Sequence, residues 1–322
     1  MKPGLLVATK GWDVERWAGR IRALLPDRPV LSTARSGVFG GRPEELADSH
    51  YILAWKPLQE TLDLLPELRV IFSLGAGVDH ILRLQRLPDA PLVRIVDPDL
   101  TARMTEYVVW QVLHHLRLGS IYAGQQRERV WADIDPPAAR DVTVGIMGLG
   151  VMGSSAAELL VRLGFPVQSW TREPKSMAGV TSFHGAEGLD PFLAGTDILI
   201  SLLPLTPATT GLIDAGLIAK LRHNGPLGGP VLINAGRGGS QVEADIVSAL
   251  KSGALAGASL DVFETEPLAA ESPLWDFENV VITPHVAAVS NPDALAGQIA
   301  AQIEAFERGE PLRNRVDPER GY

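Results

Sequence analysis

The stretch VTVGIMGLGVMG, residues 142–153, decides the fold of this chain. Its first half is an apolar run with the length of a buried strand, and its second half reads Gly148-Leu149-Gly150-Val151-Met152-Gly153. A GxGxxG pattern between a strand and a helix is the fingerprint of a dinucleotide-binding turn. The first glycine permits the turn, the second lets a pyrophosphate approach, and the third lets helix and strand pack closely. We therefore predict a dinucleotide site here, the alternative being a purely structural tight turn.

Short apolar strands alternate with amphipathic helices on both sides of this stretch. Downstream, strands are expected at 167–170, 198–202, 231–234, 258–262 and 280–283, with helices at 151–163, 215–221 and 242–252. Upstream, strands are expected at 4–9, 30–33, 51–55, 70–72 and 92–96, with helices at 12–25, 43–48 and 58–65. Alternating βα units predict parallel sheets covered by helices on both faces.

The chain is expected to divide into two α/β domains, each Rossmann-like or flavodoxin-like, with the active-site cleft between them. A break at Asp97-Pro98-Asp99 ends the first part, and Thr101 is expected to cap the next helix. A last helix near 292–308 returns the chain. We predict a substrate-binding (catalytic) domain of residues 1–100 and 294–322, and an NAD(P)-binding Rossmann domain of residues 101–293.

Composition sets limits on the class of protein. The 322 residues are 46% hydrophobic, which is enough for two domain cores, and the net charge of −9 argues against a nucleic-acid surface. There is no cysteine, and no cluster of His, Asp and Glu has convincing metal spacing, so no metal site is expected. The N-terminal apolar run is too short for a signal peptide, and no run approaches the roughly 20 apolar residues that span a bilayer. We expect a cytoplasmic protein without a membrane partner.

The segment after the second strand of this half bears on the choice of cofactor. Sites that prefer NAD usually place Asp or Glu about 20 residues after the glycine motif, bonded to the ribose 2′-hydroxyl. Here Thr171 and Arg172 stand in that place, and Lys175 is close by. A hydroxyl and a guanidinium suit a 2′-phosphate, which a carboxylate repels. We predict a preference for NADPH, with NADH possible; Glu173 remains a competing acid, and solvated charges remain the alternative reading of Arg172 and Lys175.

Three further residues indicate what could be done with the cofactor: Arg237, Glu266 and His285. Arginine can grip a carboxylate with two parallel hydrogen bonds. Histidine exchanges a proton near neutral pH, and a carboxylate beside it can fix its tautomer. Each alone is an ordinary turn arginine, loop glutamate or strand-end histidine, but together they suit hydride transfer to a 2-keto acid.

At these residues the chain resembles the D-isomer-specific 2-hydroxyacid dehydrogenases. The matching motifs, in the order of that family, are Gly148–Gly153, Leu203-Pro204-Leu205-Thr206-Pro207, Asn234–Gly238, Asp261–Leu268 and Thr283–Ala288. Three more segments resemble its glyoxylate/hydroxypyruvate reductase A branch: Ser73–Asp79, Trp170–Arg172 and Arg320-Gly321-Tyr322. One segment departs from the family pattern, Gly238–Glu243, where many members carry a more apolar stretch ending in Asp.

The resemblance implies a role for each matched position. Arg237 would hold the substrate carboxylate and keto oxygen, His285 would protonate that oxygen as hydride arrives from the nicotinamide, and Glu266 would hydrogen-bond His285. The implied cofactor-binding residues are Gly148, Leu149, Gly150, Val151, Met152, Gly153, Trp170, Thr171, Arg172, Leu203, Pro204, Ala235 and Asp261, the last at the nicotinamide end. The implied substrate-binding residues are Trp55, which would cover a small substrate, and the backbone amides of Leu74, Gly75, Ala76 and Gly77, which would bind its carboxylate.

The expected activity is NADPH-dependent reduction of small 2-keto acids, glyoxylate to glycolate and hydroxypyruvate to D-glycerate. One alternative is a dehydrogenase of larger D-2-hydroxy acids of the phenylpyruvate type, and the pocket near Trp55, Met104 and Trp275 would decide between them. Another is a non-enzymatic, nucleotide-sensing corepressor, against which the lack of polar extensions and of a basic patch argues.

A homodimer is also expected. The helix after Thr101 carries apolar residues around more of its circumference than one core needs, among them Val108, Val109, Trp110 and Leu113. The resemblance implies in addition a dimer built on the cofactor domain.

Overall fold

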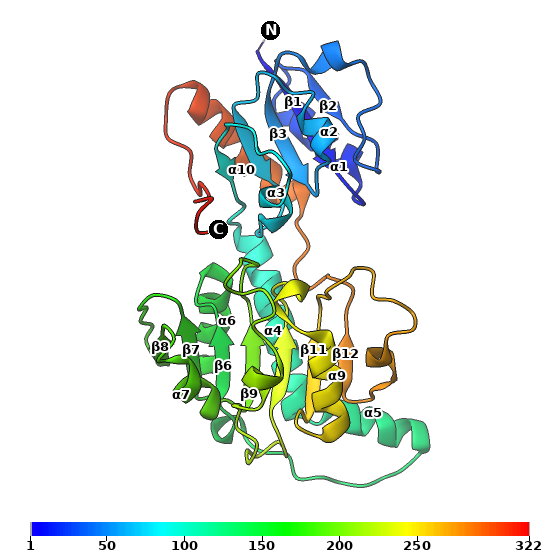
Figure 1. Cartoon of the computed structure of the whole chain (residues 1–322), viewed down its shortest axis with the longest axis vertical. Coiled ribbons are helices and arrows are strands. Elements are labelled where there is room, and N and C mark those ends of the chain that lie inside the picture. The colour runs from blue at the N-terminus through cyan, green and yellow to red at the C-terminus, as the bar shows by residue number, and fades with distance from the viewer. Residues whose placement is uncertain (1, 322) are drawn as a thin grey trace. The chain divides into compact units, whose positions relative to one another are not determined.

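The computed structural model describes residues 2–321 and divides into two compact units, each with its own parallel sheet (Figure 1). Unit 1 comprises Met1–Leu100 and Ser290–Tyr322, and unit 2 comprises Thr101–Val289. The units thus divide after residues 100 and 289, where divisions after 100 and 293 were expected. The C-terminal motif of the sequence ends at Tyr322, which lies outside the described residues.

Unit 2 holds seven parallel strands in the order β12-β11-β10-β9-β6-β7-β8. The strands are β6 (Val144–Met147), β7 (Val167–Thr171), β8 (Val180–His184), β9 (Ile198–Ser201), β10 (Val231–Asn234), β11 (Gly257–Leu260) and β12 (Val280–Ile282). The four strands β6, β9, β10 and β11 are buried along their whole length, as expected for a sheet covered on both faces. The strand order reverses between β6 and β9, and the carboxyl ends of strands at such a point are where open α/β sheets bind ligands.

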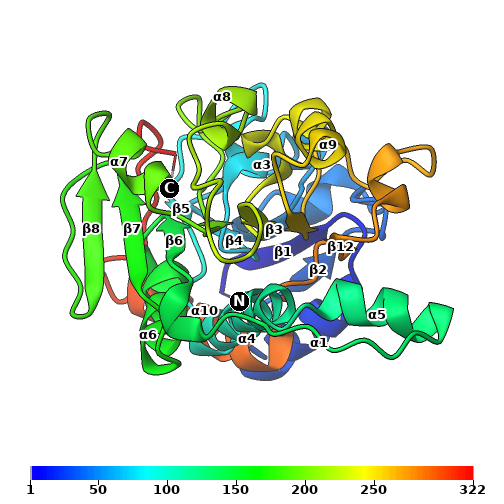
Figure 2. The ribbon, with the colours of Figure 1, turned by 90° about the horizontal axis from the view of Figure 1, so that it is seen from below.

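Helices cover both faces of this sheet (Figure 2). One face packs against α4 (Pro98–Leu116) and α6 (Val151–Arg162), whose apolar residues share a core with β6, β9 and β10. The other face packs against α7 (Leu189–Ala194), α8 (Ala215–Ile218) and α9 (Glu243–Ser252). The glycine motif lies between β6 and α6, so the predicted strand–turn–helix context is present.

Unit 1 holds five parallel strands in the flavodoxin-like order β2-β1-β3-β4-β5. Its strands are β1 (Gly4–Thr9), β2 (Val30–Ser32), β3 (Ser49–Trp55), β4 (Val70–Ser73) and β5 (Leu92–Val93). Its helices are α1 (Val14–Leu24), α2 (Gln59–Leu62), α3 (Asp79–Leu82) and α10 (Pro292–Glu307), and α1 packs against α10. The C-terminal helix is tied to the unit by the buried Arg28, whose guanidinium lies 2.8 Å from a carboxylate oxygen of Glu307.

The expected elements are present, with differences in the bounds of several of them and with four further α-helices and strands that were not expected. Helix α4 begins at Pro98 rather than after Thr101, because the carboxylate of Asp97 accepts a hydrogen bond from the amide of Leu100 at 3.0 Å and so caps the helix. Strand β5 ends at Val93, short of the expected residue 96. Strand β8 was missed because it is a partly exposed edge strand, and the helices α3, α5 (Gly119–Glu128) and α7 were also missed. Among residues 2–321 no helix is both long and apolar enough to cross a membrane.

Candidate active site

Arg237, Glu266 and His285 come from the carboxyl ends of three neighbouring strands. Arg237 follows β10, Glu266 lies on the loop after β11, and His285 follows β12. These strands are adjacent in the sheet, and the carboxyl ends of parallel strands meet at one edge. The fold of unit 2 therefore brings together three side chains that lie up to 48 residues apart in the sequence.

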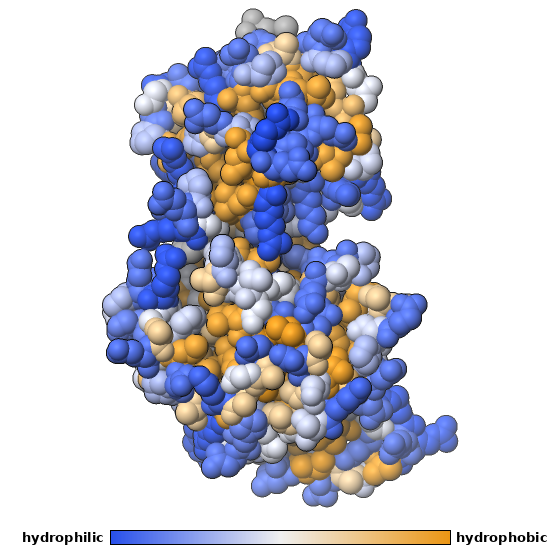
Figure 3. Space-filling view, in the orientation of Figure 1, coloured by the Kyte–Doolittle hydropathy of each residue, from blue (hydrophilic) through white to orange (hydrophobic). Residues whose placement is uncertain are grey.

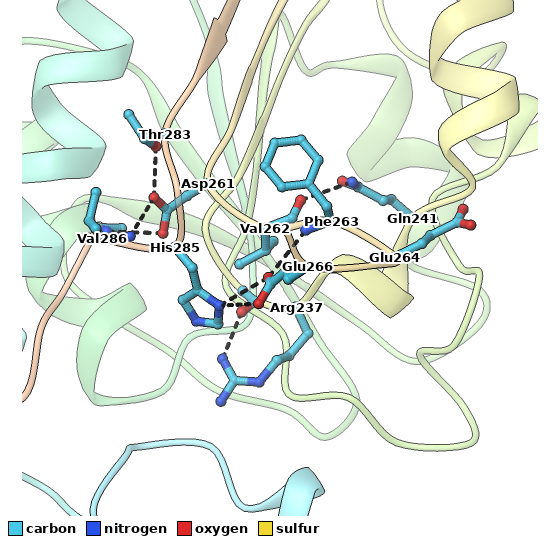
Figure 4. A network of polar contacts seen from close by, with 12 residues as sticks. Arg237, Gln241, Asp261, Val262, Phe263, Glu264, Glu266, Thr283, His285 and Val286 are labelled. Atoms are coloured by element: carbon cyan, nitrogen blue, oxygen red, sulfur yellow. Dashed lines mark hydrogen bonds and ion pairs between the residues drawn. The ribbon is translucent and has the colours of Figure 1, made fainter. Parts of the chain in front are cut away.

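His285 and Glu266 form a close pair (Figure 4). The ring nitrogen Nδ1 of His285 lies 3.0 Å from both carboxylate oxygens of Glu266. An ionised carboxylate only accepts hydrogen bonds, so Nδ1 must carry a hydrogen, and the nitrogen through which His285 can exchange a proton with a ligand is Nε2. Both side chains are partly exposed, at 31% for His285 and 24% for Glu266, so the pair is accessible to a small molecule.

The backbone at His285 has a φ of 55°, a left-handed conformation that is uncommon for residues other than glycine. Asp261 holds this turn. Its carbonyl accepts from the amide of His285 at 2.8 Å, and its carboxylate accepts from the amides of Val286 and Ala287, each at 2.9 Å, and from the hydroxyl of Thr283 at 2.7 Å. Burial raises the pKa of the Asp261 carboxyl, while these hydrogen bonds and the nearby His285 lower it.

Arg237 lies between glycines that let backbone segments approach closely. A Cβ on Gly236 would lie 2.8 Å from the carbonyl oxygen of Leu203, and one on Gly238 would lie 1.9 Å from that of Phe263. The Arg237 side chain is half-buried, and its Nη1 donates to the carbonyl of Gly236 at 2.8 Å. In Figure 4 its guanidinium and the ring of His285 point to the same side of the network.

The segment Gly238–Glu243, which departs from the family pattern, is held by hydrogen bonds of Gln241 and Glu243. Gln241 is buried; its side chain accepts from Asn234 at 2.8 Å and donates to the carbonyl of Val262 at 3.0 Å. Helix α9 begins at Glu243, whose amide donates to the Glu264 carboxylate at 2.7 Å, while the Glu243 carboxylate accepts from the amide of Glu264 at 2.5 Å. The loops that carry Arg237 and Glu266 are thereby fastened to each other.

The glycine motif has the geometry that a dinucleotide requires. Gly148 has a φ of 100°, and a Cβ on Gly153 would lie 2.0 Å from the carbonyl oxygen of Gly148, so both positions need glycine. A Cβ on Gly150, in contrast, would meet nothing within 4 Å. A glycine facing open space at a helix N-terminus is what lets a phosphate approach the backbone, so residues 148–153 fit the predicted group.

The segment after β7 carries the residues that were predicted to select the cofactor. Thr171 is buried, and its hydroxyl donates to the carbonyl of Glu173 at 2.7 Å; its contact with a 2′-phosphate stays a prediction. Arg172 is 52% exposed, with Glu173 at 3.8 Å. Lys175 donates to the carbonyl of Leu149 at 3.0 Å, which fastens this segment to the glycine motif. The basic groups here are therefore Arg172 and Lys175, and Trp170 is anchored through its indole to the carbonyl of Gly185 at 2.8 Å.

The other predicted cofactor residues also lie at carboxyl ends of strands. Leu203 and Pro204 follow β9, and Ala235 follows β10. Asp261 follows β11, but both of its carboxylate oxygens are engaged by protein donors, and its contact with the nicotinamide end stays a prediction. Among residues 2–321 no group of three or more His, Cys, Asp or Glu residues is arranged to hold a metal ion.

In unit 1, Trp55 ends β3 and lies against the loop after β4. Its ring stacks on Trp12 with centroids 4.6 Å apart, and a Cβ on Gly75 would lie 2.3 Å from it, so only glycine fits beneath the indole. Two of the four predicted amide donors are already used: Leu74 donates to the carbonyl of Ala54 at 2.9 Å, and Gly75 donates to the hydroxyl of Ser73 at 3.3 Å. The predicted carboxylate cradle is thus narrowed to the half-buried Ala76 and Gly77.

The two residues of unit 2 that were expected to set pocket size lie in different surroundings. Met104 on α4 is only 7% exposed and belongs to the core of the unit. Trp275 is 51% exposed, and its indole donates to the carbonyl of Ala269 at 2.9 Å.

Comparison with known proteins gives concordant matches. The sequence model of the D-isomer specific 2-hydroxyacid dehydrogenase NAD binding domain matches residues 109–287, which fall within unit 2. The chain is 42% identical over 317 residues to glyoxylate/hydroxypyruvate reductase A of Escherichia fergusonii and 38% identical over 317 residues to that of Yersinia enterocolitica, covering 97% of each protein and 97% of this chain in both cases.

A solved structure shares the whole fold. The NADPH-dependent glyoxylate/hydroxypyruvate reductase of Sinorhizobium meliloti, in complex with NADP and sulfate, is 48% identical, with a TM-score of 0.94 over 100% of both chains. A probable 2-hydroxyacid dehydrogenase from Rhizobium etli, in complex with NADP, HEPES and tartaric acid, is 49% identical, with a TM-score of 0.92 over 100% of both chains.

Proposed function

This chain belongs to the D-isomer-specific 2-hydroxyacid dehydrogenase family, and on that premise we propose that it reduces glyoxylate to glycolate and hydroxypyruvate to D-glycerate with NADPH. It is an NAD(P)-dependent oxidoreductase of the glyoxylate/hydroxypyruvate reductase type. The observation that carries the proposal is the His285–Glu266 pair, with two 3.0 Å contacts, at the strand edge that also presents Arg237.

Each side chain has a defined task in this reaction. The nicotinamide, when bound, supplies the hydride, and the protein supplies binding, orientation and the proton. Arg237 holds the substrate carboxylate with two hydrogen bonds and orients the keto oxygen. His285 gives that oxygen a proton from Nε2, and Glu266, at 3.0 Å from Nδ1, fixes the tautomer and the orientation of the ring. The Asp261 carboxylate holds the turn on which His285 sits.

Residues of unit 1, taken by themselves, support the proposed substrate class. Trp55 is fixed between Trp12 and the backbone of Gly75, so it is a rigid indole wall that suits a short 2-keto acid. The amides of Ala76 and Gly77 offer hydrogen bonds to a carboxylate. Steady-state NADPH oxidation with glyoxylate, hydroxypyruvate and phenylpyruvate tests the proposal. The two small acids should give the higher kcat/KM; a higher value for phenylpyruvate would favour the alternative of larger substrates, and no oxidation with any 2-keto acid would contradict the function.

Cofactor preference is the first testable consequence. Arg172→Ala should lower kcat/KM for NADPH much more than for NADH, because only NADPH carries the 2′-phosphate that a guanidinium binds. The expected loss is about 1–3 kcal/mol, roughly 5- to 150-fold. The exposed Arg162 on α6, which pairs with Glu158 at 2.7 Å, offers a matched control, since Arg162→Ala should change neither value. Equal losses with both cofactors in Arg172→Ala would show that this side chain does not read the 2′-phosphate.

We also propose that the chain forms a homodimer through α4, α5 and the segment that follows α5. On α4, Val108 is buried in the core, while Trp110 is 52% exposed. Helix α5 extends from the body of unit 2 in both ribbon views and has no buried residue (Figures 1 and 2). Apolar side chains gather over this end of the unit (Figure 3). The exposed ones on α5 and beyond it are Ile121, Tyr122, Val130, Trp131 and Ile134. Several large apolar side chains exposed on neighbouring segments are typical of an interaction site.

Light scattering at micromolar concentration should therefore give twice the chain mass of 34.6 kDa. Trp131 is fully exposed in the single chain, so Trp131→Glu should shift the population toward the monomer without unfolding it. Trp275, which is 51% exposed but lies outside α4 and α5, provides the control, because Trp275→Glu should leave the mass unchanged. A mass near 34.6 kDa for the unaltered protein would refute the dimer.

A further inference from the structure

One face of α4 is polar although it is buried against the sheet. Tyr107, Gln111 and His115 follow one another at intervals of four residues, and all three are buried or nearly so. Opposite them lie Ser259 on β11 and Asp261 just after it, two residues apart. Four residues of a helix and two residues of a strand both span about 6–7 Å. The polar side chains of α4 therefore have the same spacing as Ser259 and Asp261 opposite them. Polar groups in a core cost free energy unless they are hydrogen-bonded, so this arrangement requires an explanation.

The polar face of α4 serves two separate clusters. In the first, the hydroxyl of Tyr107 lies 2.8 Å from Thr283 Oγ1, and Thr283 Oγ1 donates to Asp261 Oδ1 at 2.7 Å. The one hydrogen of the Thr283 hydroxyl is used on Asp261, so Tyr107 must be the donor to Thr283. Both hydroxyls thus point their hydrogens toward the Asp261 carboxylate, the group that accepts from the amides of Val286 and Ala287.

The second cluster ends without reaching Asp261. Nε2 of His115 lies 2.8 Å from Ser259 Oγ, which donates to Gln111 Oε1 at 2.7 Å. It ties the same helix to the same strand, and its Gln111 and Ser259 are fully buried. Burial lowers the pKa of His115 to about 3, so this histidine stays neutral. The second cluster is therefore a structural counterpart against which the role of the first can be measured.

The first cluster lowers the pKa of the Asp261 carboxyl, which burial raises. Burial raises the pKa of Asp261, and the hydrogen bond from Thr283 is the largest of the contributions that lower it. Burial also raises the pKa of Tyr107, so that side chain remains a hydroxyl donor. The titratable groups that face Asp261 are Tyr107 from α4 and His285 from the loop after β12. A protonated Asp261 would have to place a hydrogen on an oxygen that already receives one, and would thereby give up part of its hold on residues 286 and 287.

We propose that Tyr107 and Thr283 are positioning residues, which keep the Asp261 carboxylate ionised and thereby hold the left-handed turn that carries His285. The consequence for catalysis rests on the function proposed above; the consequence for the turn does not. Neither residue touches the reacting atoms, so their removal should act through pH and not through the chemical step.

The direct test follows the backbone amides of Val286 and Ala287 by NMR while the full chain is titrated with acid. Asp261→Asn assigns the transition by abolishing it. Thr283→Val keeps the shape of the side chain and removes the hydroxyl, so the midpoint should move to higher pH by about one unit. Tyr107→Phe should move the midpoint in the same direction by less. It removes the hydrogen bond to Thr283, which strengthens the bond from Thr283 to Asp261 only indirectly. Thr283→Ser should restore the original midpoint, and Ser259→Ala should leave it unchanged.

The kinetic readout separates this inference from the proposed function. The acid limb of reductase kcat/KM should follow the amide midpoint in each variant, since activity requires the ionised carboxylate and is lost as pH falls through its titration. Amide midpoints that coincide in Thr283→Val, Tyr107→Phe and the parent chain would overturn the proposal. If the parent chain reduces no 2-keto acid, the proposed function is refuted. The amide titration would still test whether Tyr107 and Thr283 keep Asp261 ionised. If Thr283→Val does not fold, Tyr107→Phe and Thr283→Ser decide it.

Discussion

Replacing His285 by alanine is expected to lower reductase kcat/KM for glyoxylate by about two to four orders of magnitude at every pH, since that is the usual contribution of a positioned proton donor. The ring lies 3.0 Å from both oxygens of Glu266 through Nδ1, which leaves Nε2 as the nitrogen that serves the keto oxygen. Alanine removes both the donor and the partner of Glu266. NADPH binding, measured by fluorescence, should persist, because the glycine motif at 148–153 is a separate element of unit 2.

Glu266→Gln tests the same pair more finely. Glutamine can still accept from Nδ1 but carries no charge, so the ring keeps its orientation and loses its ionic partner. We expect kcat/KM for glyoxylate to fall, by less than in His285→Ala, while the acid limb, assigned to Asp261, should stay. A kcat/KM equal to that of the parent, in a variant that binds NADPH normally, would falsify the pair and leave Glu266 a loop carboxylate.

Much of this site could be predicted because it depends on topology. The alternation of strands and helices predicts parallel sheets, and a parallel sheet places the carboxyl ends of neighbouring strands at one edge. Arg237, Glu266 and His285 each follow a strand in the sequence, so their meeting needed only the right strand order. The order β12-β11-β10 provides it. The glycine motif could be predicted for the same reason, since its context is local to one strand and one helix.

What the sequence did not predict depends on individual hydrogen bonds. Thr171 looks like a phosphate ligand by position, but its hydroxyl donates to a carbonyl two residues away, and the amide of Leu74 continues a strand contact to Ala54. The link between Tyr107 and Thr283 spans 176 residues. Its signal, polar residues at four-residue intervals on α4, is visible in the sequence, but the strand that it faces is set only by the packing of the unit.

Arg237→Lys should raise KM for glyoxylate and lower kcat, with a combined loss in kcat/KM of roughly ten- to a hundredfold. Lysine keeps the charge but is a point donor, and it cannot make the two parallel hydrogen bonds by which a guanidinium orients a carboxylate. The surroundings limit any adjustment: Arg237 is half-buried, and its flanking glycines lie against the carbonyls of Leu203 and Phe263. The backbone at residue 237 is therefore unable to shift toward the substrate to compensate for the changed side chain.

Control variants must show that the loss in kcat/KM comes from weaker substrate binding and not from a change in the fold or in cofactor binding. Arg162→Lys, an identical exchange at an exposed position on α6, should leave all constants unchanged, and the Kd for NADPH should be the same in both variants. Arg237→Ala should lose more than Arg237→Lys, and added guanidinium should restore part of its rate, because the missing group is then supplied in its planar, two-pronged form. Methylammonium, which restores only charge, should restore less. Kinetics near those of the parent in Arg237→Lys would mean that charge alone suffices at this position, and the substrate carboxylate would then have to be held by another group.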